Sequence, residues 1–252
     1  MGNNISVTIL TKNSSVHLAE CLGALETFAE VVIVDNGSTD DTIAIASGFK
    51  NVTVYEHPFI GFGPLKNIAI DKASNDWILS VDSDEIVTPE LADEILGLNL
   101  NSTTIYAIRR DNYYHRRLIR GCGWQNDQVQ RLFYRKSTRY DEKAVHEGLI
   151  MNETLKTEQL QGRLKHYPYD SASQLIHKMQ HYSTLWAEEN QGTKKASPFK
   201  AVLYGMVTFF KCYFLKKGWV DGYAGLLISI SNANGVFYKY IKLYEADRQN
   251  RM

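Results

Sequence analysis

Residues 77–85 read Trp-Ile-Leu-Ser-Val-Asp-Ser-Asp-Glu, an apolar run followed without a spacer by an acidic cluster. The apolar part, Trp77–Val81, predicts a strand of the kind that a parallel sheet buries on both faces. The acidic part, Asp82-Ser83-Asp84-Glu85, therefore lies at a strand end. Two carboxylates two residues apart at this position can reach one hard divalent cation and the diphosphate that the cation neutralises. The alternative for an Asp-x-Asp pattern taken alone is an acidic turn that caps the next helix.

The residues around this stretch alternate predicted strands and helices. Apolar runs predict further strands at 5–10, 31–34, 52–55, 105–109 and 129–134. Helices are predicted at 16–28, at 66–72 and after Thr88-Pro89, where a cap residue precedes proline. Ser38, with Asp41 three residues later, predicts another helix cap. This order predicts an α/β fold with a mainly parallel sheet and helices on both faces.

Three polar clusters follow strands of this predicted sheet: Thr11-Lys12-Asn13, Asp35-Asn36-Gly37 and the acidic cluster. Ligands of such sheets bind beyond the carboxyl ends of the strands, so we expect the three clusters to share one rim. The Asp35 carboxylate can accept the N3–H of a uracil ring there. The alternative is that Asp35 and Ser38 only organise a turn and a helix start.

A glycine-containing stretch, Gly61-Phe62-Gly63, comes after the third predicted strand. It lacks the third glycine of a dinucleotide-binding fingerprint, which excludes that interpretation. We expect it to be a flexible loop that places Lys66 near a phosphate.

Three motifs together resemble the family-2 glycosyltransferases of the GT-A fold. They are Ile5-Ser-Val-Thr-Ile-Leu-Thr-Lys-Asn, Val-Val-Ile-Val-Asp35-Asn-Gly-Ser-Thr-Asp-Asp-Thr and Ile-Leu-Ser-Val-Asp82-Ser-Asp-Glu. The resemblance covers roughly the first 150 residues. It implies an inverting transfer from a nucleoside diphosphate sugar, usually UDP-linked, with Mg²⁺ or Mn²⁺. It also implies that Thr11, Asn13 and Asp35 hold the nucleoside, that Asp82 contacts the ribose side and that Asp84 contacts the metal.

An inverting transfer needs a base that takes the proton of the acceptor hydroxyl. The family usually places an acid after the later strands, often as Glu-Asp, whereas this sequence has His146-Glu147. Glu147 is the predicted base, His146 an orienting group and Asp127 the alternative base. The competing interpretation is that His146 and Glu147 only close a hairpin.

A looser resemblance extends over most of the chain. The stretches 123–124, 130–135, 145–147 and 164–167 are similar to bacterial β-glucosyltransferases that add glucose to heptose in the lipopolysaccharide inner core. This resemblance implies UDP-glucose as the donor and an anionic glycolipid as the acceptor. His166, predicted in a loop, is either an additional ligand of the metal or diphosphate or a structural residue.

The charges of the chain are segregated although their formal sum is zero. Residues 1–104 carry 4 Lys or Arg against 15 Asp or Glu, whereas residues 105–140 carry 9 against 2. Arginine binds phosphate bidentately, so a basic second half suits an anionic acceptor. Nucleic acid is excluded as a partner, because the acidic half would repel it and no recognition module is present.

The C-terminal third differs in pattern from the rest. We expect a GT-A domain at 1–168 and a helical extension at 169–252, with helices at 171–189 and 198–217. The apolar, lysine-flanked helix 198–217 either lies in the plane of the inner membrane or packs into a core. No apolar stretch is long enough to span a membrane. Three scattered cysteines and a start without a secretory signal predict a cytoplasmic protein.

Two alternatives to a glucosyltransferase of the lipopolysaccharide core stay open. The acceptor could be another cell-envelope glycan or a lipid carrier, or the chain could be a non-catalytic carbohydrate-binding protein on the same fold. A sugar nucleotidyltransferase is disfavoured, because residues 11–15 replace the glycine-rich basic loop that such an enzyme needs after its first strand.

Overall fold

The structure is a computed structural model that describes residues 4–143 and 147–249. The chain forms two compact units. The sheet unit combines residues 1–110 with 128–166, and the helical unit combines residues 111–127 with 167–252. The sequence indicated a division near residue 168, but it did not indicate that 111–127 groups with the C-terminal helices.

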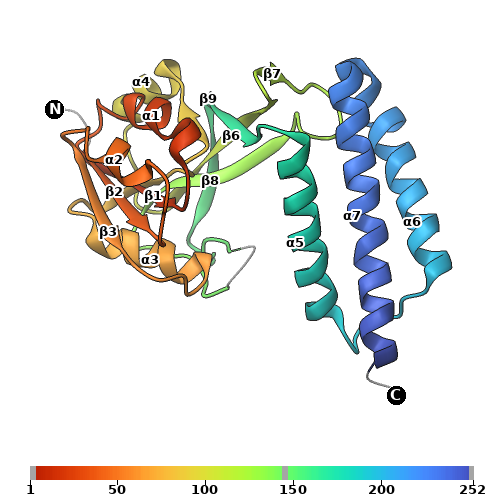
Figure 1. Cartoon of the computed structure of the whole chain (residues 1–252). Helices are drawn as coiled ribbons and strands as arrows, with labels where there is room; N and C mark the ends of the chain where they lie inside the picture. The colour runs from red at the N-terminus through yellow and green to blue at the C-terminus, as the bar shows by residue number, and fades with distance from the viewer. Residues whose placement is uncertain (1–3, 144–146, 250–252) are drawn as a thin grey trace. The chain divides into compact units, whose positions relative to one another are not determined.

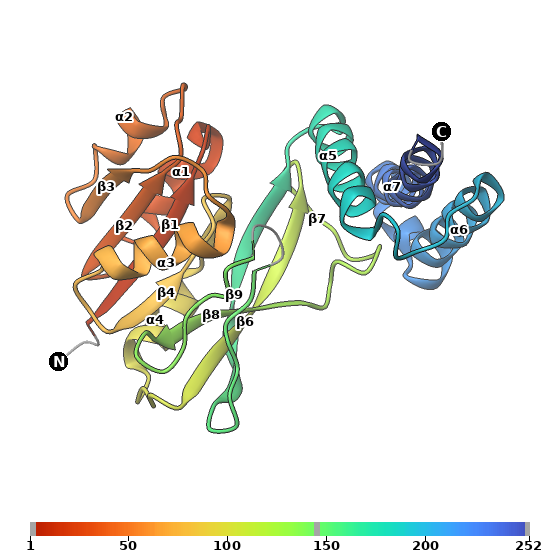
Figure 2. The same ribbon diagram turned by 90° about the horizontal axis from the view of Figure 1, so that it is seen from below.

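The first four strands confirm the predicted parallel sheet. They are β1 (Ile5–Thr11), β2 (Glu30–Asp35), β3 (Val52–Glu56) and β4 (Trp77–Ser80). They lie side by side in the order β3-β2-β1-β4, all parallel, as Figures 1 and 2 show. Their carboxyl ends therefore meet at one rim of the sheet.

The sheet continues beyond β4 with later strands in the order β8-β6-β9-β5. These are β8 (Asp127–Tyr134), β6 (Thr104–Tyr114), β9 (Lys156–Tyr169) and β5 (Glu85–Val87), with the short β7 (Arg117–Leu118) paired to β6. The pairs β4–β8, β5–β9 and β6–β7 are antiparallel, so the whole α/β sheet is mixed. β5 and β9 were not predicted. The placement of His166 in a loop was wrong, because it lies in β9 opposite Glu85.

Helices cover both faces of the parallel strands, as predicted. They are α1 (Ser15–Gly23), α2 (Thr42–Ala46), α3 (Phe62–Lys72) and α4 (Pro89–Gly97). Figures 1 and 2 show α1 and α3 on opposite faces of the strands. On the α3 side, Leu65 and Ile70 pack into one buried cluster with Val34 and Ile78. Burial of both faces explains why these strands read as continuous apolar runs.

Three local predictions in this unit were wrong. The helix predicted at 16–28 ends at Gly23. Ser38 does not cap a helix, because α2 begins only at Thr42 and Ser38 instead bonds to Asp35. Gly61-Phe62-Gly63 is not a flexible loop, because Gly61, with φ of 113°, precedes the first turn of α3.

The helical unit contains α5 (Ala172–Asn190), α6 (Pro198–Phe210) and α7 (Gly222–Gln249). A π-helical turn, η1 (Lys211–Leu215), and a 3₁₀ turn, η2 (Gly218–Asp221), connect α6 to α7. α7 packs against both other helices (Figure 1). Ser171 and Ser197 cap α5 and α6 through their side chains, which confirms the predicted helix starts. No helix in the described part of the chain is long and apolar enough to cross a membrane.

Candidate active site

The ends of β1 and β2 are joined through Asp35. Thr11 pairs with Asp35 in the parallel register, and its hydroxyl donates to Asp35 Oδ2 at 2.8 Å. The same carboxylate accepts bonds from the backbone N–H groups of Gly37 and Ser38 and from the Ser38 hydroxyl. Burial alone would raise the pKa of Asp35, but the bonds from Ser38, Thr11 and Gly37 hold it below its usual range. Asp35 is 2% exposed and holds the 35–38 turn through these hydrogen bonds. Its contact with uracil stays a prediction.

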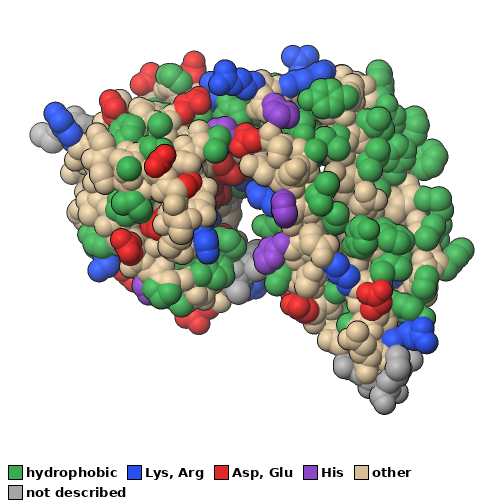
Figure 3. Space-filling view, viewed as in Figure 1, with side chains coloured by type: hydrophobic (Ala, Val, Ile, Leu, Met, Phe, Trp, Pro, Cys, Tyr) green, Lys and Arg blue, Asp and Glu red, His purple; other side chains and the backbone are tan. Residues whose placement is uncertain are grey.

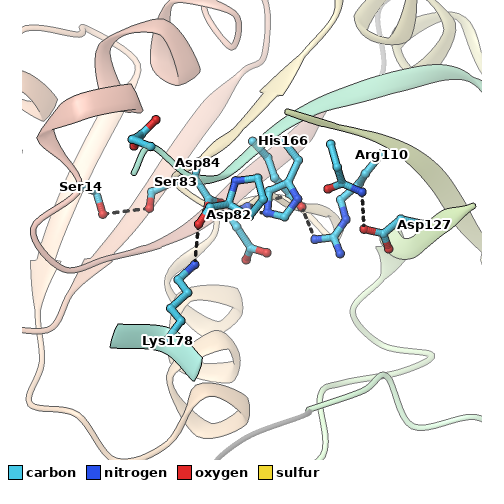
Figure 4. A network of polar contacts seen from close by, with 12 residues as sticks. Ser14, Asp82, Ser83, Asp84, Arg110, Asp127, His166 and Lys178 are labelled. Atoms are coloured by element: carbon cyan, nitrogen blue, oxygen red, sulfur yellow. Dashed lines mark hydrogen bonds and ion pairs between the residues drawn. The ribbon is translucent and has the colours of Figure 1, made fainter. Parts of the chain in front are cut away.

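Asn13 connects the same two strand ends on the outside. Its backbone, with φ of 50°, donates to Ser38 Oγ at 2.8 Å, and its side-chain oxygen accepts from the Thr39 N–H at 2.8 Å. The neighbouring Ser14 accepts a bond from the Ser83 hydroxyl at 2.9 Å, which ties this rim to the acidic cluster (Figure 4). The three predicted polar clusters therefore meet at one edge of the sheet.

Two buried cations hold Asp82. Lys66 Nζ lies 3.3 Å from Asp82 Oδ1, and Arg131 forms a short ion pair with Asp82 Oδ2. Burial by itself would raise the pKa of Asp82, but the charges of Arg131 and Lys66 hold it well below its usual range. The carboxylate is thus ionised and fixed in orientation, while 36% of its side chain stays exposed on the rim.

Glu85 anchors the other end of the acidic cluster beneath the surface. Its side chain is fully buried and accepts bonds from Arg131 at 2.5 Å and from Arg110 at 3.0 Å. Its second oxygen accepts the Asp82 N–H at 3.1 Å. Although burial alone would lower the pKa of Arg131, Asp82 and Glu85 raise it well above its usual range. Asp82 and Glu85 are therefore both paired with cations, and Glu85 is the member of the cluster that lies wholly beneath the surface.

Asp84 faces a histidine from β9. Its Oδ2 lies 3.7 Å from His166 Nε2, and Figure 4 shows the two side chains approaching each other beside Asp82. The pairing of β5 with β9 causes this approach, because Glu85 and His166 are register partners. The Asp84 and His166 side chains are 31% and 13% exposed, so both can be reached from the rim.

These two side chains fit a divalent cation that takes its other ligands from a substrate. A cation about 2.1 Å from each of two ligand atoms can bridge atoms up to about 4.2 Å apart, and the Asp84–His166 separation of 3.7 Å lies within that reach. Among the described residues no group of three or more His, Cys, Asp or Glu is arranged to hold a metal. Such a site matches a cation that keeps water and phosphate ligands, as Mg²⁺ does with nucleotides.

Glu147 lies beside Lys66 rather than in open solvent. Its Oε1 is 2.9 Å from Lys66 Nζ, so Lys66 bridges Glu147 and Asp82. The described residues on either side of 144–146 do pair as the two arms of a hairpin, because Tyr140 and Leu149 form an antiparallel bridge. The side chain nevertheless points to the acidic cluster. His146, the predicted orienting group, lies outside the described residues.

Asp127, the alternative base, begins β8 and belongs to the helical unit. It accepts a hydrogen bond from Asn112 Nδ2 at 3.0 Å, drawn in Figure 4. Its assignment and that of Glu147 both stay predictions.

Sequence reasoning did not assign roles to two residues that organise this site. Arg131 was one of eight arginines in a basic stretch, and Glu85 was the end of the acidic cluster. A signal for Arg131 was available, because it is the single charged residue of the predicted strand 129–134 and directly precedes the apolar residues Leu132 and Phe133. A charge that is buried in such a strand needs a partner of opposite charge.

The chain is similar to known proteins in both sequence and structure. Residues 6–149 match the model of glycosyl transferase family 2. An uncharacterized glycosyltransferase of Rickettsia conorii is 32% identical over 98% of this chain and 92% of the relative. The lipopolysaccharide core biosynthesis glycosyltransferase LpsC of Rhizobium meliloti is 28% identical over 96% of this chain and 92% of the relative. The crystal structure of Staphylococcus aureus TarS residues 1–349 with UDP-GlcNAc aligns with a TM-score of 0.49 at 13% identity, covering 99% of this chain and 92% of that one.

Proposed function

This chain belongs to glycosyltransferase family 2, and on that premise we propose that it transfers glucose from UDP-glucose to a heptose of the lipopolysaccharide inner core. The transfer is a metal-assisted single displacement with inversion at the sugar carbon. The observation that carries the proposal is the arrangement of the acidic cluster. Asp82 is held by Lys66 and Arg131, and Asp84 faces His166 on the same rim.

Asp84 and His166 would hold Mg²⁺ or Mn²⁺ at this rim. When bound, the metal supplies Lewis-acid stabilisation of the negative charge that builds on the departing diphosphate. The imidazole is a nitrogen ligand, which suits a transition metal better than Mg²⁺. We therefore expect Mn²⁺ to support donor binding better than Mg²⁺, and the Asp84→Asn and His166→Ala variants to lose that preference.

The remaining donor residues orient the nucleotide. Thr11, Asn13 and Asp35 line the β1–β2 rim that receives the nucleoside, and Asp82 faces the ribose with its exposed edge. Lys66 contributes a fixed positive charge behind Asp82, where it favours the diphosphate over a neutral ligand. Because these groups are already held by hydrogen bonds and ion pairs, little reorganisation accompanies donor binding.

Glu147 is the proposed base that accepts the proton of the acceptor hydroxyl, with His146 as an orienting group. Its ion pair with Lys66 places it next to the donor-binding acids within the sheet unit. A Glu147→Gln variant keeps the shape but cannot take a proton. We expect it to bind the UDP-sugar normally and to lose transfer by about 10²–10⁴-fold. If the Asp127→Asn variant shows this pattern instead, Asp127 is the base.

The proposed acceptor follows from charge and from the named relative. LpsC is described as acting in lipopolysaccharide core biosynthesis, and that core is an anionic glycolipid. The excess of Lys and Arg beyond residue 104 of this chain suits such an acceptor. A glycolipid acceptor lies in a membrane, so the proposal includes a peripheral contact of the helical unit with the cytoplasmic face of the inner membrane. Another anionic envelope glycan or a lipid carrier is the alternative acceptor.

The deciding experiment is a calorimetric titration of UDP-glucose, UDP-galactose and UDP-GlcNAc in Mn²⁺, followed by UDP release with isolated core acceptors. We expect UDP-glucose to bind tightest and Asp84→Asn to weaken its binding about tenfold or more. Asp93→Asn, an exposed acid on α4, is the matched control and should bind as the wild type does. Failure of every UDP-sugar to bind would overturn the donor assignment. Donor binding without UDP release in the presence of any acceptor would favour a carbohydrate-binding protein.

A further inference from the structure

The solvent side of α6 in the helical unit is almost entirely apolar. Phe199 is 77% exposed, Phe210 61% and Leu215 79%. Other exposed apolar side chains on α6 and η1 are Val202, Leu203, Met206, Val207 and Phe214. Residues 199, 203, 206 and 210 recur at helical spacing, so they form one continuous stripe. Figure 3 shows hydrophobic side chains gathered over α6 and the adjoining part of α7.

This stripe is not the face that α6 uses for folding. The buried residues of α6 are Ala201 and Gly205, and a side-chain carbon at Gly205 would lie 3.3 Å from the Ala233 carbonyl oxygen of α7. α6 therefore approaches α7 closely at its small residues, with Tyr204 against Tyr240, and leaves most of its large apolar side chains exposed to solvent. A helix that is apolar all round is normally buried on all sides. An exposed apolar patch of this extent marks an interaction surface.

The stripe continues onto η2 and the start of α7. Trp219 is 56% exposed, Val220 43% and Tyr223 66%. Tryptophan and tyrosine are the residues that proteins place at the boundary between lipid and water. The apolar surface thus carries interfacial aromatic residues at one end.

A basic hairpin is fastened beside these aromatic residues. The carboxylate of Asp221, 1% exposed, accepts the N–H groups of Arg120 at 3.0 Å and Gly121 at 2.6 Å. The Tyr114 ring lies 6.4 Å from the Tyr223 ring. Arg116, Arg117 and Arg120 are exposed on this hairpin. The helical unit therefore presents arginines next to the aromatic end of its apolar surface.

The charges of these two segments have one sign. Residues 112–126 and 190–220 together contain nine Lys or Arg and no Asp or Glu. A second copy of the same surface would bring like charges together, which disfavours self-association through this face. Anionic lipid headgroups provide the opposite charge, and arginine binds their phosphates bidentately.

We propose that the surface formed by α6, η1, η2 and the 115–120 hairpin binds the face of an anionic lipid bilayer. The apolar stripe inserts among the acyl chains near the headgroups, and the arginines and lysines contact lipid phosphates. α6 lies along the membrane rather than across it, because no helix among the described residues has the length and apolarity to span. The inference extends the proposed function, since it brings the protein to a lipid-anchored acceptor, but lipid binding itself needs no donor and no transfer.

The test is cosedimentation of the full chain with vesicles of phosphatidylcholine, with and without phosphatidylglycerol. We expect binding to the anionic vesicles and little binding to phosphatidylcholine alone. The Phe210→Ser/Phe214→Ser variant should lower the partition coefficient on the order of tenfold per ring. The Arg116→Glu/Arg117→Glu/Arg120→Glu variant should lower it on the order of a hundredfold or more, since each basic residue contributes about fivefold.

Matched controls separate this surface from general effects of apolarity and charge. Ile176→Ser removes another exposed apolar side chain, on α5. Lys50→Glu/Lys72→Glu/Lys156→Glu makes the same change in net charge on exposed residues of the sheet unit. Both controls should bind anionic vesicles as the wild type does.

Two results would overturn the proposal. One is equal vesicle binding by the wild type and by the surface variants. The other is a stable dimer in sedimentation velocity that Phe210→Ser/Phe214→Ser dissociates, because a second copy would then cover the stripe. Calorimetric binding of UDP-glucose is measured on every variant. Unchanged donor binding with lost vesicle binding identifies a surface defect, whereas vesicle binding without donor binding contradicts only the proposed function.

Discussion

Arg131 shows how one residue can organise a cluster that it does not belong to. It lies within β8 with only 5% of its side chain exposed, and it forms ion pairs with both Asp82 and Glu85. Three acids within four residues would repel one another at a strand end. With Arg131 between two of them, the inward acids are neutralised and Asp84 remains on the rim.

Replacement of Arg131 by Met should therefore be costly. The side chain keeps a similar volume, but Glu85 loses one of its two cations and Asp82 keeps only Lys66. Breaking a buried ion pair from one side costs about 3–5 kcal/mol of unfolding free energy. Urea denaturation measures this loss of unfolding free energy. Arg131→Lys is the control, because it keeps the positive charge but not the two-pronged guanidinium group that can bond to both acids. An unchanged denaturation midpoint for Arg131→Met would refute the structural role.

Asp35 predicts a specific acid dependence of stability. Its folded pKa is lowered from 3.8, so the unfolded state takes up a proton first as the pH falls. The contribution of ionised Asp35 to the free energy of unfolding is complete well above pH 3.8 and declines as the pH falls through and below 3.8. Asp35→Asn should remove this part of the acid dependence and cost about 1–3 kcal/mol at neutral pH. Urea denaturation of both proteins between neutral pH and pH about 3 tests this, and parallel pH profiles would contradict it.

At the scale of elements, the start of α3 contacts the hairpin whose described arms are residues 140–143 and 147–149. A side-chain carbon at Gly63 would lie 1.9 Å from the Asp141 carbonyl oxygen, and the Gly63 N–H donates to the Lys143 carbonyl at 3.2 Å. Asn67 adds two bonds to the Tyr140 backbone. The hairpin that carries Glu147 is thus held against the helix that carries Lys66, and this explains their ion pair.

Gly63→Ala should push the hairpin away from α3. The Asp141 backbone can shift less easily than a side chain could, so we expect the free energy of unfolding to fall by about 1–3 kcal/mol. We also expect turnover to fall with little change in UDP-sugar binding. Gly97→Ala is the matched control, because a carbon added there meets nothing within 4 Å. Thermal denaturation and UDP release measure the two effects. Equal behaviour of both variants would show that the close contact does not matter.

At the scale of the whole molecule, the chain folds into two units, and each unit is built from two separate stretches of the sequence. Residues 111–127 leave the sheet unit and contribute Tyr114, Ile119 and Cys122 to the buried cluster of the helices. Asp221 fastens the same segment through two backbone N–H groups. The hairpin and the helices should therefore behave as one cooperative unit.

Asp221→Ala tests this cooperativity. The buried Gly121 N–H and the part-buried Arg120 N–H lose a charged acceptor, at a cost of about 1–3 kcal/mol for the buried group. Hydrogen exchange measured by mass spectrometry should show faster exchange in 111–127 and in α6–α7 together, with β1–β4 unchanged. Glu245→Ala, an exposed acid near the end of α7, is the control. Faster exchange confined to residues 111–127 would mean that the segment is only an appendage.

Much of the sheet unit could be predicted from short stretches. Apolar runs such as Val31–Val34 and Trp77–Val81 form strands because burial on both faces requires them to be apolar throughout. Thr88, Ser171 and Ser197 cap helices because a side-chain oxygen reaches the N–H groups of the next turn. These are effects between near neighbours in the chain. The helix cap predicted at Ser38 was wrong because the Ser38 hydroxyl and N–H donate to the Asp35 carboxylate instead.

The acidic cluster 82–85 and its place at a strand end were thus determined by the sequence alone. Only the tertiary structure decided which acid faces which partner, because those partners come from far along the chain. Lys66 and Arg131 hold Asp82 from α3 and β8, and β9 brings His166, 82 residues later in the chain, to 3.7 Å from Asp84. The strand β9 is polar and contains no apolar run from which it could be predicted. The exposure of α6 depends on which of its faces packs against α7. Contacts of this kind follow from strand register and helix packing, which local patterns do not encode.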